Sequence, residues 1–170
     1  MTTAPAPART LLVVYHSQTG ATAQMAQAVA QGAHSEPGVT TRLLHATAAG
    51  PADLLAADGY VFASPENLAA IAGLMKDFFD RCYYPVLDRL NGRPYAVVVC
   101  AGSDGSNAVR QIERIATGWR LRAAAPALIV CTHAQTPEAI VAPKTVAADD
   151  LARGETLGAA LAAGLALGIF

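Results

Sequence analysis

The chain has 170 residues, of which 53% are hydrophobic and 15% are charged. This composition predicts one folded domain with a sizeable core and excludes a disordered chain. Twelve basic and thirteen acidic residues leave a formal charge of −1. The balance excludes the basic surface that a nucleic-acid partner requires, and it lacks the acidic excess by which some electron carriers steer toward basic partners.

The termini and the cysteines predict the cellular location of the protein. Residues 1–9 hold no apolar signal-peptide core, and their Ala-Pro alternation predicts a flexible tail before a single domain at 10–170. The apolar stretch 157–170 is shorter than the roughly 20 residues that cross a bilayer. Cys82, Cys100 and Cys131 form no Cys-x-x-Cys pair, so we expect buried free thiols. We therefore expect a cytoplasmic protein with no membrane insertion.

Expected strands and helices alternate along the chain. We expect five strands, at 10–15, 39–45, 59–63, 94–100 and 127–132. Between them we expect a helix through Met25 and Val29 that ends by Gly38, and helices at 51–57, 68–83 and about 107–118. After the fifth strand we expect a loop with Pro137 and Pro143, and then a last helix capped by Asp149 or Asp150. Five strands separated by helices predict an α/β fold, a doubly wound parallel sheet with helices on both faces. Ligands of such sheets bind beyond the carboxyl ends of the strands, so the loops after strands one, three and four matter most.

The loop after the first strand has the composition of a phosphate site. Backbone N–H groups and the positive end of a helix dipole converge on this loop, and Ser17, Thr19 and Thr22 add hydroxyl groups. The loop fits neither the triphosphate pattern with its lysine nor the dinucleotide glycine pattern. The two lysines, Lys76 and Lys144, lie elsewhere in the sequence, so we predict a cradle for one phosphate monoester without a cation. The alternative is a polar turn that only caps the helix.

The run 13–22, Val-Val-Tyr-His-Ser-Gln-Thr-Gly-Ala-Thr, resembles the first strand and phosphate loop of the flavodoxin superfamily, Ser/Thr-x-Thr-Gly-x-Thr. The resemblance implies a five-stranded sheet in the order 2-1-3-4-5 and an FMN cofactor. It also implies that the ribityl phosphate is held by Ser17, Gln18, Thr19, Gly20, Ala21 and Thr22.

Two further segments, 63–68 and 73–81, resemble the NAD(P)H-dependent FMN reductase branch, including its quinone-reductase relatives. This likeness implies a flavin-side loop at Ser64, Pro65, Glu66, Asn67 and Leu68. The corresponding third loop, which would pass the isoalloxazine edge, contains Ala101, Gly102, Ser103, Asp104 and Gly105.

Some residues in these loops keep two interpretations. Relatives often have an aromatic residue at the position of Leu68, followed by Gly and Asn where this chain has Ala69 and Ala70. Asp104 either contacts a flavin N–H or caps the next helix. At Glu66 we expect the peptide to matter more than the carboxylate, so Glu66→Gln should barely change FMN affinity.

The resemblance implies an FMN-binding oxidoreductase that uses NAD(P)H and passes electrons to a quinone, a flavin or another small acceptor. Because the flavin carries the chemistry, we assign no catalytic side chain. The histidines lack metal-ligand spacing, so we assign no metal, and we expect His16 to be exposed. Two alternatives stay open: a flavodoxin-type carrier serving a redox protein, and a flavin-free relative acting as a binding or regulatory module.

The resemblance also allows a homo-oligomer, although the sequence does not show its symmetry. In reductase relatives the region of Tyr83 and Tyr84 often lies near the flavin of a neighbouring subunit. We therefore expect these two tyrosines either to line a shared site or, as the simpler interpretation, to pack or lie on the surface. We expect Trp119 to pack behind the helix at about 107–118.

Overall fold

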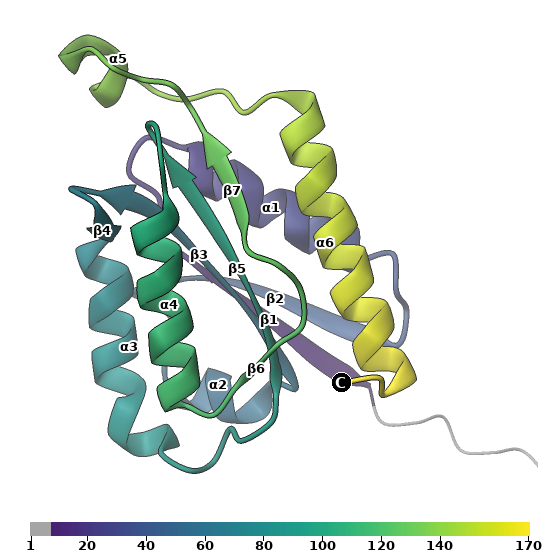
Figure 1. Cartoon of the computed structure of the whole chain (residues 1–170). Coiled ribbons are helices and arrows are strands. Elements are labelled where there is room, and N and C mark those ends of the chain that lie inside the picture. The colour runs from purple at the N-terminus through teal and green to yellow at the C-terminus, as the bar shows by residue number, and fades with distance from the viewer. Residues whose placement is uncertain (1–7) are drawn as a thin grey trace, which may run out of the picture.

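The computed structural model describes residues 8–170, so most of the predicted tail lies outside the described residues. A seven-stranded sheet forms the centre, with helices on both faces (Figure 1). The strands are β1 (Arg9–Tyr15), β2 (Val39–His45), β3 (Gly59–Asn67), β4 (Ala70–Ile71), β5 (Pro94–Ala101), β6 (Arg122–Ala123) and β7 (Leu128–Cys131). The helices are α1 (Ala21–Ala33), α2 (Pro51–Ala56), α3 (Gly73–Val86), α4 (Ser106–Gly118), α5 (Pro137–Val141) and α6 (Ala148–Leu167). Arg9 does not belong to a tail, because it begins β1 and pairs with Asp58 at 2.9 Å.

The order of the strands is β2-β1-β3-β5-β6, and β7 also pairs with β5. The pairs among these strands are parallel, whereas β4 runs antiparallel to the end of β3. Since β5 and β7 are the fourth and fifth predicted strands, the long strands confirm the predicted order 2-1-3-4-5. The sequence did not predict the two-residue strands β4 and β6.

The central strands form where the sequence has continuous apolar runs. All eight residues of β5 are buried, as are four consecutive residues of β1, from Leu11 to Val14. Strands covered by helices on both faces bury every side chain, which is why these runs do not alternate with polar residues. The sheet therefore has one core on each face.

The core beneath α2, α3 and α4 contains an aromatic cluster. The ring of Phe62 in β3 lies 5.1 Å from that of Phe79 in α3, and Phe79 lies 5.3 Å from Trp119. These separations fall within the range of favourable edge-to-face contacts. Trp119 is buried directly after α4, as the sequence predicts. The cluster fixes α3 and α4 against the sheet.

The opposite core lies beneath α1 and α6, whose backbones touch through glycines. A Cβ atom added to Gly32 of α1 would lie 1.9 Å from the carbonyl oxygen of Glu155. A Cβ added to Gly158 of α6 would lie 1.9 Å from the carbonyl oxygen of Val29. Side chains at these two positions would therefore force the helices apart.

The start of α6 differs from the prediction. Its N-cap residue is Ala147, and Asp149 and Asp150 lie within the first turn instead of capping it. Their carboxylates still face the positive end of the helix dipole, which explains the acidic pair at this place. Across residues 8–170, no helix combines the length and the apolar character needed to cross a membrane.

The predicted helix at 68–83 begins too early. Strand β3 continues to Asn67, and the chain turns at Leu68 and Ala69, both with positive φ, before pairing as β4. Two positive φ angles are typical of the tight turn of a hairpin. Helix α3 begins only at Gly73, so Leu74 is partly exposed, not part of the inner face. The helical spacing of the apolar residues predicted a helix where the chain forms a hairpin, because the same spacing is compatible with both structures.

The segment after β7, which the sequence assigned to a loop, contains the short helix α5. Thr136 caps this helix by accepting a hydrogen bond from the N–H of Ala139, and Pro137 occupies its first turn. None of its five residues is buried. In Figure 1, α5 stands beyond the edge of the sheet at which β5 and β7 end. Residues 132–147 connect β7 to α6 and include α5. We call this segment the strap.

Candidate cofactor-binding site

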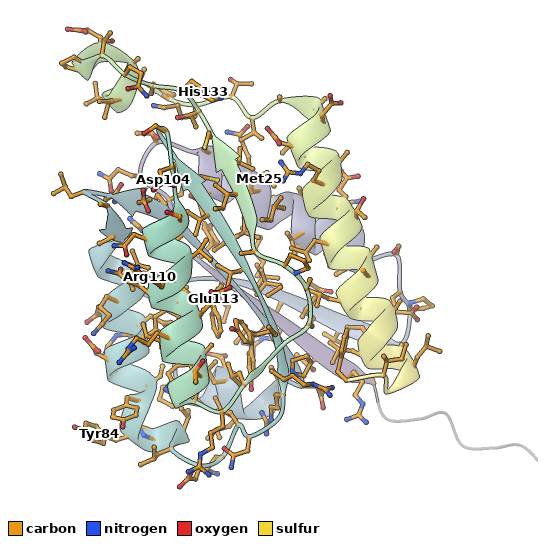
Figure 2. All side chains as sticks on the ribbon, viewed as in Figure 1. Met25, Tyr84, Asp104, Arg110, Glu113 and His133 are labelled. Carbon is orange, nitrogen blue, oxygen red and sulfur yellow. The ribbon has the colours of Figure 1, made fainter. Side chains whose placement is uncertain are left out.

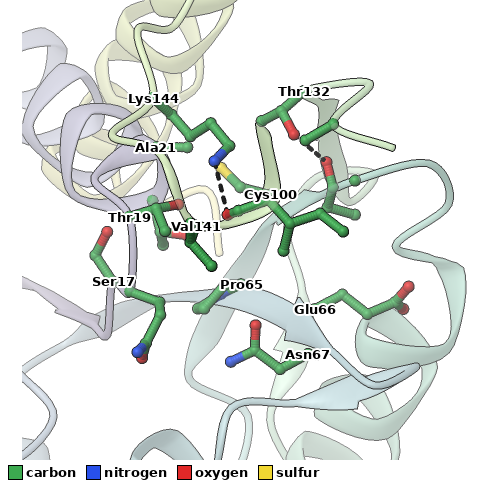
Figure 3. A pocket seen from close by; sticks show the side chains of 16 residues that line it. Ser17, Thr19, Ala21, Pro65, Glu66, Asn67, Cys100, Thr132, Val141 and Lys144 are labelled. Atoms are coloured by element: carbon green, nitrogen blue, oxygen red, sulfur yellow. Dashed lines mark hydrogen bonds between the residues drawn. The ribbon is translucent and has the colours of Figure 1, made fainter. Parts of the chain in front are cut away.

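A cavity of about 300 Å³ lies at the carboxyl ends of β1, β3 and β5, under the strap (Figure 3). Its volume is at the lower end of the range for small-molecule sites. Four segments distant in sequence provide its walls: Ser17, Gln18, Thr19, Ala21, Thr22, Pro65, Glu66, Asn67, Cys100, Ala101, Gly102, Thr132, Ala134, Ile140, Val141 and Lys144. The site is therefore at the topological switch point that the fold predicts.

The loop after β1 offers free hydrogen-bond donors to this cavity. Gly20 has a φ of 101°, which allows it to precede α1, and its N–H donates to Ser17 Oγ at 3.2 Å. No side chain caps α1, so the N–H groups of its first turn lack partners within the helix. The hydroxyl groups of this loop therefore do not serve as side-chain caps of α1. Ser17 Oγ acts as an acceptor toward Gly20, so the proton of the Ser17 hydroxyl is not used in this bond.

Thr22 has a different environment from the other residues of the loop. It is 1% exposed, and it lines the same cavity wall as Cys100 at the end of β5. Burial raises the pKa of the Cys100 thiol to about 11, although the hydrogen bond with Thr22 acts in the opposite direction. This thiol is therefore protonated at neutral pH. Thr22 is thus buried as well as lining the cavity.

In the second loop, two polar side chains stabilise its shape. Ser64 is fully buried: its hydroxyl donates to the carbonyl oxygen of Pro65 at 2.9 Å and accepts from the N–H of Ala72 at 3.1 Å. Glu66 accepts two hydrogen bonds, from the N–H groups of Gly105 and Ala108, each at 3.0 Å. The carboxylate of Glu66 therefore ties the second loop to the third loop and to the start of α4.

The end of the second loop lies outside the cavity. Leu68 is completely exposed at the tip of the hairpin, with a φ of 50°. Asn107 of α4 supports this turn by donating a hydrogen bond to the carbonyl oxygen of Ala69. The structure does not bring Leu68 together with the residues that line the cavity.

The third loop contributes Ala101 and Gly102 to the cavity, whereas its later residues shape the start of α4. Asp104 accepts hydrogen bonds from the backbone N–H and the hydroxyl of Ser106. Gly105 is the N-cap residue, with a φ of 87°. These contacts favour the helix-start interpretation of Asp104 over a direct contact with a ligand.

The structure thus brings ten of the sixteen predicted residues to the cavity wall. The six that do not line it are Gly20, Ser64, Leu68, Ser103, Asp104 and Gly105. The sequence did not predict the wall residues Cys100, Thr132, Ala134, Ile140, Val141 and Lys144. Cys100 is adjacent to a predicted loop, but the other five lie on the strap, whose path depends on tertiary contacts.

Tyr83 and Tyr84 lie in the last turns of α3. Figure 2 shows Tyr84 at the end of the molecule opposite Asp104, which follows β5 near the cavity edge. Tyr84 is 79% exposed and Tyr83 is 42% exposed. Neither tyrosine lines the cavity of its own chain.

His16, which the sequence predicted to be exposed, is buried at the end of β1. Its Nδ1 lies 3.1 Å from Nε2 of His45 at the end of β2. The backbone N–H of Thr47 donates to Nδ1 of His45, so Nε2 of His45 carries the proton and donates to His16. The two imidazoles therefore form a hydrogen-bonded pair beside the loop after β1. Burial lowers the pKa of His16; a hydrogen bond with Gln18 raises it, and the nearby His45 lowers it.

We expect the stability of the protein to decrease as His16 gains a proton. Because its pKa is lowered from 6.5, the folded protein binds fewer protons than the unfolded chain. The stabilising contribution is fully present above that unfolded value and is lost as the pH falls through it toward the folded pKa. Urea unfolding should show a lower free energy at about pH 5.5 than at about pH 7.5. His16→Gln should weaken this dependence, whereas His34→Gln, which changes an exposed histidine, should preserve it. Equal pH dependence in the His16 variant would assign the effect to other groups.

The fold is that of a flavodoxin-like protein. A solved structure described as a flavodoxin from the domain Archaea superposes with a TM-score of 0.74 at 20% identity, covering 92% of this chain and 98% of that chain. At this identity the likeness concerns the fold alone.

The chain belongs to the NADPH-dependent FMN reductase family, whose family model matches residues 46–135. A flavodoxin of Aquifex aeolicus is 41% identical over 93 residues, which are 55% of this chain and 48% of that protein. An NAD(P)H dehydrogenase (quinone) of Acidithiobacillus ferrooxidans is 32% identical in an alignment 91 residues long, which covers 42% of this chain and 46% of that protein. The chain thus spans about half the length of the curated relatives it matches. The family match covers the second and third loops, and the loop after β1 lies before it in the sequence.

Proposed function

We propose that this protein binds FMN in the cavity at the carboxyl edge of the sheet and acts as an NAD(P)H-dependent oxidoreductase. The observation that carries the proposal is the set of unpaired donors at the start of α1, next to a cavity whose second and third loops lie within the segment that the family model matches. Bound FMN would accept a hydride from a nicotinamide and pass electrons to a small acceptor such as a quinone.

The residues present fit the phosphate end of FMN. The donors are neutral N–H groups and hydroxyls at a helix start, and these are the groups that bind a phosphate monoester. Ser17 and Thr19 would donate from their hydroxyls, and Ala21 would donate from its backbone N–H. The helix dipole adds positive potential at the same place.

The second and third loops would flank the flavin ring. Pro65 and Asn67 line one wall of the cavity, and Ala101 and Gly102 line another. Small side chains at 101 and 102 let backbone groups approach a ligand closely. The bonds from Glu66 to the start of α4 hold the two loops at a fixed separation. The protein thus orients the cofactor.

A flavodoxin-type electron carrier is the second candidate. The observation that favours it is the 41% identity to the Aquifex aeolicus flavodoxin. The nearly balanced charge of this chain supports the enzyme instead, because an acidic surface is what steers such carriers to basic partners. Direct oxidation of NADH or NADPH by the FMN-loaded protein, with a quinone or dye as acceptor, supports the enzyme. Reduction only in the presence of a separate reductase supports the carrier.

An FMN titration of the purified protein, followed by quenching of flavin fluorescence, tests the site. We expect saturable one-to-one binding, and we expect Thr19→Val to raise the Kd by about tenfold or more, because it removes a hydrogen bond to a charged group. Thr40→Val, at the exposed beginning of β2, is the matched control and should leave the Kd unchanged. Absence of binding at tens of micromolar would refute the proposal and leave the flavin-free alternative.

A further inference from the structure

The strap brings one of the two lysines of the chain to the cavity wall. The sequence predicts a phosphate site without a cation, because Lys144 lies 122 residues after Thr22. In the structure Lys144 lines the same cavity as Thr19 and Ala21, and Figure 3 shows the three on one side of it. The site therefore contains a positive charge that the sequence did not reveal.

Two sets of hydrogen bonds hold the backbone of Lys144 to the phosphate loop. Its N–H donates to the carbonyl oxygen of Thr19 at 2.8 Å. Gln24 of α1 donates to the carbonyl oxygens of both Gly20 and Lys144, at 3.0 and 2.8 Å, and accepts from the N–H of Val146 at 3.0 Å. The strap is thus fixed to the phosphate loop at this one place, although α5 itself has no buried residue.

The ammonium group of Lys144 has no carboxylate partner within residues 8–170. It donates instead to the carbonyl oxygens of Ala139, Ile140 and Ala142, at 2.7, 2.9 and 2.6 Å. By contrast, Lys76 forms an ion pair with Asp80 at 2.6 Å. Glu66, the carboxylate in the cavity wall, is engaged by two backbone N–H groups. The charge of Lys144 is therefore solvated by neutral carbonyls and is not neutralised.

We propose that Lys144 is a phosphate-binding residue, whose ammonium group exchanges carbonyl oxygens of α5 for the phosphate of bound FMN. This inference rests on the proposed function. A phosphate oxygen is a stronger acceptor for an ammonium group than a neutral carbonyl, so the exchange is favourable once the ligand is present. The flexible four-carbon stem permits the change while the backbone stays attached to Thr19. Because two of these carbonyls belong to α5 and the third to its C-cap residue Ala142, phosphate binding would also release the end of this helix.

The experiment compares FMN with riboflavin, which lacks the phosphate. The Kd of each is measured by fluorescence quenching for the wild type, Lys144→Gln, Lys144→Arg and the control Lys76→Gln. We expect Lys144→Gln to raise the FMN Kd by about tenfold and to leave the riboflavin Kd unchanged, because only the charge-assisted bond to phosphate is lost. Lys144→Arg should keep most of the preference for FMN, and Lys76→Gln should match the wild type.

The other outcomes separate this inference from the proposed function. If Lys144→Gln raises the Kd values of FMN and riboflavin equally, or changes neither Kd, the lysine only stabilises the strap and the inference is wrong. If the wild type binds riboflavin as tightly as FMN, the phosphate is not recognised, and the inference fails while a flavin site remains. If the wild type binds neither flavin, the proposed function fails and Lys144 loses its role with it. Unchanged riboflavin binding in Lys144→Gln also shows that the variant is folded.

Discussion

Replacing Gly158 with alanine should lower the free energy of unfolding by about 3 kcal/mol, at the upper end of the cost of overpacking. The added Cβ would lie 1.9 Å from the carbonyl oxygen of Val29, and backbone cannot move aside as a flexible side chain can. Within an isolated helix the same change would instead be favourable by up to about 1 kcal/mol. Urea unfolding followed by circular dichroism measures the difference.

Gly118→Ala is the matched control, because it also lies in a helix but a Cβ there meets no atom within 4 Å. It should be neutral or slightly stabilising. Gly32→Ala should reproduce the loss seen for Gly158→Ala, since its Cβ would meet the carbonyl oxygen of Glu155 at 1.9 Å. The double variant should lose less than the sum of the two, because one separation of α1 from α6 relieves both clashes. Wild-type stability in both single variants would show that α1 and α6 do not pack in this way.

The second large effect is expected at Glu66. Glu66→Gln should lower the free energy of unfolding by about 1–2 kcal/mol, because a carboxylate bonded to two N–H groups is exchanged for an amide with one oxygen. The remaining amide nitrogen would face an N–H donor, and the charge that complements the start of α4 would be lost. We also expect several-fold weaker FMN binding, since the two loops that Glu66 joins both line the cavity.

Glu113→Gln on the exposed face of α4 is the control, and it should change neither stability nor affinity. Figure 2 shows Glu113 on α4. The expectation drawn from the sequence, that Glu66→Gln barely changes FMN affinity, treated the side chain as free. If stability and affinity both stay at wild-type values, that earlier expectation is correct and the two hydrogen bonds contribute little.

Much of the fold was predictable because its signals are local. The continuous apolar runs of β1 and β5 indicate strands buried on both faces, and their alternation with helices indicates a parallel sheet. The loop after β1 was recognisable for the same reason, since Gly20 and its neighbouring hydroxyl residues are consecutive. A site made from the ends of adjacent parallel strands then follows from topology.

The errors occurred where local signals were compatible with two structures. Ile71 fits the face of a helix, but β3 continues past Pro65, and the chain turns back at Leu68 and Ala69. The burial of His16 depends on His45, which β2 places beside it across the sheet. Neither outcome is encoded within a short window of sequence.

The periodicity of the sequence by itself predicted the long strands and the helices between them, and the resemblance of its loops to a known superfamily implied the order of the strands and ten of the residues that line the cavity. Only the tertiary structure decided that Lys144 joins the phosphate loop, that Glu66 binds the start of α4, and that Gly32 and Gly158 bring two helices into backbone contact. Each of these contacts joins residues at least 39 positions apart. Such contacts depend on how the helices and the strap pack on the sheet, and hydrophobic patterning along the chain carries no information about that packing.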